Sequence, residues 1–282
     1  MRKANLLKVL AGLILGLTQL QAGEITFDLA TGLFRGPGGL SRLEVYLGID
    51  REQITFEQSR GRYSAHLAGV VLVKRHGQIV DFTELSIDDE VQSLEYSSVG
   101  TIAHQTAFTL APGRYEMQVV LEDRQGNQSE RSMEIQIPPI QELELAVSTI
   151  ELAALIRRSG GPKDFLKKGL AVWPNAGAVY HDRQPLLWYY AEIYGLTPLD
   201  TVEISSTISG QDGAVVAQTS KRTPSPSLVL QEWGALNLSL LDTGDYRLGL
   251  TATVNGATTS AATWFRVDRD SVAPPDTGDI LA

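Results

Sequence analysis

The sequence of 282 residues contains no cysteine. This absence excludes disulfides, thiolate metal ligands and cysteine nucleophiles together. Histidine is scarce, and no two of the four residues stand at the i, i+2 or i, i+4 spacing of paired metal ligands. They are His66, His76, His104 and His181. Two domains of this total length can still bury adequate cores. We therefore expect no metal or cofactor and a fold stabilised by packing alone.

The motifs of several common catalytic sites are also missing. No Gly-x-Ser-x-Gly elbow is present, and residues 159–163 lack the full spacing of a phosphate-binding loop. The acidic runs 88–90 and 268–270 lack the alternating oxygen ligands and the turn glycine of a calcium loop. Nothing singles out a catalytic pair among the 33 acidic residues. We expect a protein that is not an enzyme and name no catalytic residue.

No apolar run is long enough to cross a bilayer, which needs roughly 20 residues. The N-terminus instead begins Met-Arg-Lys, continues with an apolar segment over 6–17, and offers the small residue Ala22 before Gly23. This order of basic, apolar and small residues predicts a signal peptide over 1–22 and an exported protein, periplasmic or extracellular. Retention of the segment as an anchor is the alternative.

Positive charge is in short supply. The formal net charge is −9, and loss of Arg2, Lys3 and Lys8 with the signal peptide would leave −12. Such a chain repels phosphate backbones and anionic lipid, which argues against nucleic-acid binding or stable membrane association. The partner we expect is another exported or cell-surface protein.

What the chain has in abundance is strand-like alternation. Over 114–123 apolar residues alternate with polar ones, and a return strand over 133–137 ends at Pro138-Pro139. The second half repeats the plan over 246–254, where Asn255-Gly256 predicts a type I′ hairpin turn into a strand over 257–267. Further strands are expected over 43–49 and 186–194. Residues 142–158 fit either a helix or two strand pieces, and we favour strands because the second half needs a first strand.

An internal repeat supports two similar halves. Residues 110–115 and 241–246 both read Leu-x-x-Gly-x-Tyr at the start of a long alternating strand. This is the place of a tyrosine corner in immunoglobulin-like sandwiches, in which the hydroxyl bonds the backbone just upstream. We expect Tyr115 and Tyr246 to fill that structural role, with Gly113 and Gly244 permitting the turn. The fold prediction is all-β: two tandem immunoglobulin-like sandwiches over 23–139 and 140–267, followed by a disordered tail over 268–282.

Aromatic residues gather on the expected strand 186–194. Trp188, Tyr190 and Tyr194 share one face, while Tyr189, Ala191 and Ile193 share the other. The first face could be a platform for a sugar or a protein. Because both faces are apolar, we favour a central strand that is buried on one side and covered on the other.

Several segments together resemble one family. They read LAVSTIELA over 145–153, FLKKG over 165–169, WPN over 173–175 and LLWYYAEIY over 186–194. With LEVYL at 43–47 and PGRY at 112–115, they resemble the N-terminal part of exported bacterial GWxTD-motif proteins, over about residues 24–267. The Gly-Trp-x-Thr-Asp motif itself is absent from this sequence. The resemblance implies an exported bacterial protein built of sandwich modules, and it implies little about activity.

Three functions are compatible with these observations. The first is a non-enzymatic structural or protein-interaction module. The second is a carbohydrate-binding accessory protein that uses the aromatic face. The third is a two-domain periplasmic chaperone, which would need a basic anchor between its domains.

Overall fold

The computed structural model describes residues 25–59, 61–93, 95–96, 100–141, 143–158, 160–182 and 184–269. The predicted signal peptide and nearly all of the predicted tail lie outside these ranges. Within them the chain is almost entirely β, without α-helix, and it contains the short 3-10 turns η1 (Pro37–Gly39), η2 (Arg51–Gln53) and η4 (Lys163–Phe165). The all-β prediction is confirmed.

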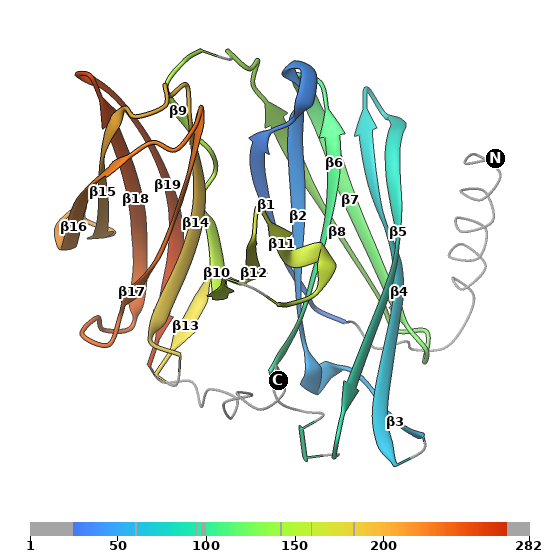
Figure 1. Cartoon of the computed structure of the whole chain (residues 1–282). Helices are drawn as coiled ribbons and strands as arrows, with labels where there is room; N and C mark the ends of the chain where they lie inside the picture. The colour runs from blue at the N-terminus through green and yellow to red at the C-terminus, as the bar shows by residue number, and fades with distance from the viewer. Residues whose placement is uncertain are drawn as a thin grey trace.

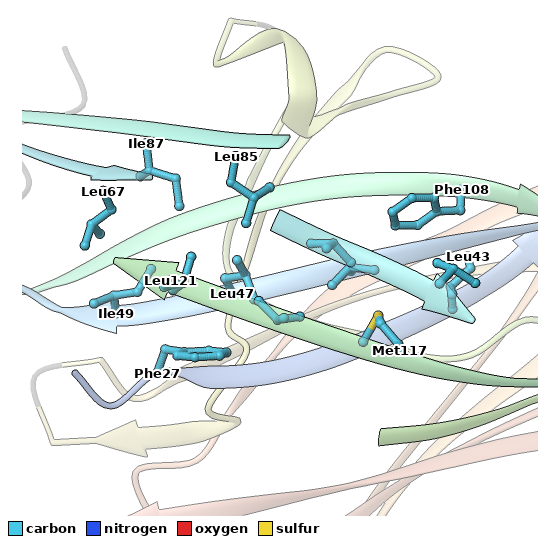
Figure 2. Close-up of a cluster of buried hydrophobic side chains, with 14 of the residues drawn as sticks. Phe27, Leu43, Leu47, Ile49, Leu67, Leu85, Ile87, Phe108, Met117 and Leu121 are labelled. Atoms are coloured by element: carbon cyan, nitrogen blue, oxygen red, sulfur yellow. The ribbon is translucent and has the colours of Figure 1, made fainter. Parts of the chain in front are cut away.

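The first half of the chain forms two antiparallel sheets. One has the order β1-β2-β6, from β1 (Asp28–Arg35), β2 (Ser41–Asp50) and β6 (Thr101–Leu110). The other has the order β3-β4-β7-β8 with β5 also on β4, from β3 (Glu57–Ser59), β4 (Arg62–Arg75), β5 (Gln78–Val91), β7 (Gly113–Asp123) and β8 (Gln128–Ile137). Figure 2 shows the core between them, in which Leu43 and Leu47 of β2 lie near Met117 and Leu121 of β7.

The second half repeats this layering with two further sheets. One has the order β11-β12-β10-β14-β17 with β9 also on β14, from β9 (Ala146–Val147), β10 (Glu151–Arg157), β11 (Leu166–Lys167), β12 (Leu170–Pro174), β14 (Leu186–Tyr194) and β17 (Val229–Asn237). The other has the order β13-β19-β18-β15-β16, from β13 (Val179–His181), β15 (Thr201–Gly210), β16 (Val215–Pro224), β18 (Gly244–Val254) and β19 (Ala257–Asp268). A second core, including Ile193, Leu248 and Leu250, fills the space between them.

Local sequence signals account for much of this. Met117, Val119 and Leu121 of β7 are fully buried, as their alternation predicts. Asn255 and Gly256 have φ of 50° and 84°, so the β18–β19 hairpin turns through two residues with positive φ, as predicted. The segment 142–158 supplies β9 and β10, which confirms the strand interpretation where it is described.

The two sheet pairs lie against each other. A third buried cluster joins Phe34 of β1 to residues of β10, β12 and β14, and the rings of Phe34 and Tyr190 have centroids 6.0 Å apart. Figure 1 shows β1 and β2 facing β10, β11 and β12 across the middle of the molecule. Sheet β1-β2-β6 is thus covered on both faces. The division into two domains over 23–139 and 140–267 stays a prediction.

Candidate functional site

The most distinctive polar feature is a group of ionisable side chains buried where the two sheet pairs meet. Lys167 of β11 forms close ion pairs with Glu44 of β2 and Glu151 of β10. Its Nζ also donates to the hydroxyl of Tyr46 at 3.2 Å, and Tyr46 donates to Glu44 Oε2 at 2.8 Å. Lys167 is 8% exposed and both carboxylates are 2% exposed. We call Lys167, Glu44, Glu151 and Tyr46 the interface network.

Local geometry explains how Lys167 reaches this place. β11 and β12 form a tight hairpin, whose tip residues Lys168 and Gly169 have φ of 46° and 90°. Side chains alternate along β11, so Leu166 is 48% exposed while Lys167 points into the interface. There its Nζ lies 4.7 Å from the ring centroid of Phe34 and 5.4 Å from that of Tyr190. The charge is therefore held by two carboxylates and by aromatic ring faces.

The two carboxyl groups of the network have opposite pKa shifts. Burial raises the pKa of Glu151 to about 7, because the opposing effect of Lys167 does not fully compensate for lost hydration. One oxygen, Glu151 Oε1, has no hydrogen-bond partner among the described residues. Burial alone would also raise the pKa of Glu44, but the charge of Lys167 and the bonds from Arg42, Lys167 and Tyr46 together outweigh it and hold that pKa below its usual value. Burial and the nearby carboxylates raise the pKa of Tyr46 well above its ordinary value.

A second polar group lies beside the interface network. Tyr190 and Tyr194 donate to the two oxygens of Glu192 at 2.7 and 3.0 Å, and Lys168 pairs with Glu192 at 2.9 Å. The hydroxyl of Tyr194 accepts the backbone N–H of Arg35 at 3.0 Å, which ties β1 of the first half to β14 of the second. The guanidinium of Arg35 lies 4.5 Å from the Tyr194 ring centroid. These bonds fix the orientation of β1 against β14.

The structure places the three candidate binding aromatics inside the molecule. Tyr190 is fully buried and Tyr194 is 4% exposed, while Trp188 packs against the third cluster and is half-buried. The opposite face of β14 lies in the second core. The covered-strand interpretation therefore describes β14, and an open sugar platform formed by Trp188, Tyr190 and Tyr194 is wrong. Tyr190 and Tyr194 are covered by the other sheet pair and are closed to a ligand, whereas Trp188 keeps partial exposure.

Both repeated tyrosines lie at the start of their strands and bond the backbone upstream. The Tyr115 hydroxyl donates to the carbonyl of Ala111 at 2.9 Å, and that of Tyr246 donates to the carbonyl of Asp242 at 3.1 Å. The two differ in environment: Tyr115 is 6% exposed, whereas the bond of Tyr246 is exposed to solvent and its ring stacks on Phe265 at 5.8 Å.

The two repeated glycines differ in backbone conformation and in the space available for a side chain. Gly113 has φ of +154°, and a Cβ there would lie 3.1 Å from the Arg75 guanidinium. Gly244 does not have a positive φ, and a Cβ there meets ordinary contacts beyond 3.5 Å. The conformational argument made for both glycines from the sequence therefore applies to Gly113 and not to Gly244.

In the described ranges, no group of three or more His, Asp or Glu side chains could hold a metal ion. In the same part of the chain, no helix has the length and apolarity needed to cross a membrane.

The interface network was not predicted from the sequence. Glu44 stands between Leu43 and Val45, where a charged residue ordinarily faces solvent, and Lys167 stands in a Leu-Lys-Lys-Gly segment that is typical of an exposed turn. No local signal marks a strand face that a distant part of the chain will cover. The sequence did indicate that β14 is covered, because both faces of this strand are apolar.

No family model matches the chain, and no curated protein matches it. The resemblance to GWxTD-motif proteins therefore stays a prediction. Among solved structures, a red sea bream transglutaminase aligns at 12% identity and a TM-score of 0.26, over 89% of this chain and 32% of that one. Dimeric latent PorU from Porphyromonas gingivalis aligns at 11% identity and a TM-score of 0.31, over 86% of this chain and 20% of that one. The chain thus spans about a third and a fifth of their lengths.

A biofilm-associated protein domain aligns at 10% identity and a TM-score of 0.24, over 95% of this chain and 70% of that one. A bacterial ice-binding adhesin aligns at 14% identity and a TM-score of 0.25, over 88% of this chain and 67% of that one. At such TM-scores these likenesses carry no argument about function. What the chain itself shows is an all-β fold of stacked, mostly antiparallel sheets.

Proposed function

We propose that the protein is an exported, non-enzymatic interaction module, in which two β-sandwiches are held as one stiff body that presents a sheet edge to another protein. The main observation that supports this proposal is the interface network. It buries a lysine and two carboxylates between the halves, together with the apolar cluster around Phe34 and Tyr190. Separation of the halves would break the Glu44–Lys167 pair, leave the buried charges without each other, and expose that cluster, so the halves keep one relative orientation.

The edge strand β16 is the surface we propose for contact with the partner. It stands last in the order of its sheet, pairs with β15, and nine of its ten residues are exposed. Val215 and Val216 are 59% and 48% exposed, which is uncommon for adjacent β-branched residues. The register of β16 on β15 shifts between Val215 and Ala217 and is regular from Ala217 to Pro224. An edge strand of this kind offers backbone N–H and C=O groups to an extended segment of another chain. The occupant we propose is such a segment of an exported or cell-surface protein.

The chaperone alternative has less support. Its cationic anchor should stand open in a cleft between the halves, whereas Lys167 at this junction is buried and paired with two carboxylates, and the neighbouring Lys168 is paired with Glu192. A ligand carboxylate would have to displace Glu44 or Glu151 from contacts that already satisfy the cation.

Site-specific photo-cross-linking in the native cell tests the proposal. A photoreactive residue replaces Gln218 in β16 of the full chain, and a matched variant carries it at Val80, an exposed position of β5. We expect a discrete cross-linked species from position 218 that position 80 does not give. Absence of any such species at 218, or the same species from both positions, would overturn the proposal.

A further inference from the structure

The outer face of the sheet β13-β19-β18-β15-β16 carries a hollow whose lining includes no residue of the interface network. It has a volume of about 640 Å³, within the roughly 300–1,000 Å³ range of small-molecule sites. Gly177, Ala178 and Val179 form one wall. The other lining residues are Gln211, Asp245, Trp264, Phe265 and Arg266. The hollow belongs to the second half of the chain.

Trp264 supplies an open aromatic surface there. Phe265 and Val267 of β19 point into the second core, so the alternating Trp264 and Arg266 point outward. Trp264 is 52% exposed, in contrast to the fully buried Tyr190. A half-exposed indole beside a hollow offers a flat apolar face, and burial of that face by a ligand is favourable.

Three polar side chains of the hollow bond one another. Asp245 accepts from Gln211 Nε2 at 2.8 Å and from Arg266 Nη1 at 3.1 Å. A carboxylate can accept about four hydrogen bonds and a guanidinium can donate five, so both keep free capacity toward a ligand. Because the charges of Asp245 and Arg266 compensate each other, the hollow favours an uncharged ligand with several hydroxyl groups.

The backbone of the wall is also unusual. Ala178 has φ of +53°, a conformation that residues with a Cβ rarely adopt. Its N–H donates to the Asn175 carbonyl at 3.1 Å, and its own carbonyl accepts the N–H of Arg266 at 2.9 Å. Such conformations concentrate at binding sites, where surrounding bonds hold them in place. Here the bond to Arg266 fixes Ala178 beside β19, at the edge of the hollow.

We infer that this hollow is a binding site for an uncharged saccharide. A pyranose ring has an apolar C–H face that fits the indole of Trp264, and its hydroxyls are both donors and acceptors that fit Asp245, Arg266 and Gln211. Arg247 lies directly opposite Trp264 on β18 but does not line the hollow. The inference goes beyond the proposed protein contact at β16, and neither requires the other.

A glycan array that carries neutral and anionic oligosaccharides, probed with the full chain, is the first test, followed by calorimetric titration of the neutral hits. We expect Trp264→Ala and Asp245→Ala each to weaken binding at least about tenfold, as for central residues of a binding site. The matched control is Leu240→Ala, because Leu240 is 96% exposed in the same half and does not line the hollow. That variant should bind as the wild type does.

Three results would overturn the inference: no neutral saccharide bound, binding confined to anionic glycans, or unchanged affinity in Trp264→Ala. Circular dichroism of each variant shows whether it is folded, and Trp264→Phe keeps the test valid by retaining a smaller aromatic face and part of the affinity. The cross-link at position 218 should persist in Trp264→Ala. Failure of the saccharide site and failure of the protein contact are therefore distinguishable.

Discussion

Replacement of Lys167 by methionine should destabilise the protein strongly. Methionine matches the length of the aliphatic stem but leaves Glu44 and Glu151 together without their shared cation, each 2% exposed. Removal of one partner from a buried ion pair costs about 3–5 kcal/mol, because the remaining charge is dehydrated and uncompensated. We expect a loss of that size in the free energy of unfolding at pH 7.5. At pH 5 the loss should be smaller, because Glu151 then binds a proton and one of the two charges disappears.

The assay is urea unfolding of the full chain at both pH values, followed by tryptophan fluorescence and far-UV circular dichroism. Lys168→Met is the matched control: its side chain is 48% exposed and pairs with Glu192, so we expect a loss of about 1 kcal/mol or less. Addition of Glu151→Gln to Lys167→Met should recover part of the stability at pH 7.5. The reasoning fails if Lys167→Met costs no more than Lys168→Met, or if its cost is the same at both pH values.

Three further predictions concern Glu151, the two repeated tyrosines and the two repeated glycines. The folded-state pKa of Glu151 lies above its ordinary 4.5, so its contribution to stability should fall as pH rises from 4.5 to 7, by at most about 3 kcal/mol, and Glu151→Gln should remove this part of the slope in pH-dependent unfolding. Tyr115→Phe should lose about 1 kcal/mol in chemical denaturation, and Tyr246→Phe less, because the bond of Tyr246 is exposed; equal losses would contradict this order. Gly113→Ala should lower the thermal midpoint clearly, since φ is +154°, whereas Gly244→Ala should leave it nearly unchanged.

The sequence predicted those elements in which a single strand carries its own signal. Tyr115, Met117 and Val119 alternate with polar residues, and Asn255-Gly256 fixes a hairpin through two positive φ values. Each signal is local, because one buried face or one turn imposes it. The stacked-sheet class of the fold follows from such signals.

The interface network could not be found in this way. Glu44 alternates with Leu43 and Val45, the same pattern that a solvent-facing glutamate would give. Its burial depends on a hairpin more than a hundred residues away that delivers Lys167. Trp264 is the reverse case, because a tryptophan in a strand is ordinarily buried and this one is exposed. It lies in a strand rich in threonine and alanine, and its exposure is visible only once the neighbouring strands are placed. Long-range contacts decide both cases.

The central claim is that the two halves keep one orientation relative to each other, and a distance measurement tests it directly. The chain has no cysteine, so spin labels can be placed through Val80→Cys in β5 and Val216→Cys in β16, both exposed. Pulsed electron spin resonance should give one narrow distance distribution for this pair, and Lys167→Met should broaden it. A broad or multiple distribution in the otherwise unaltered protein would contradict the account.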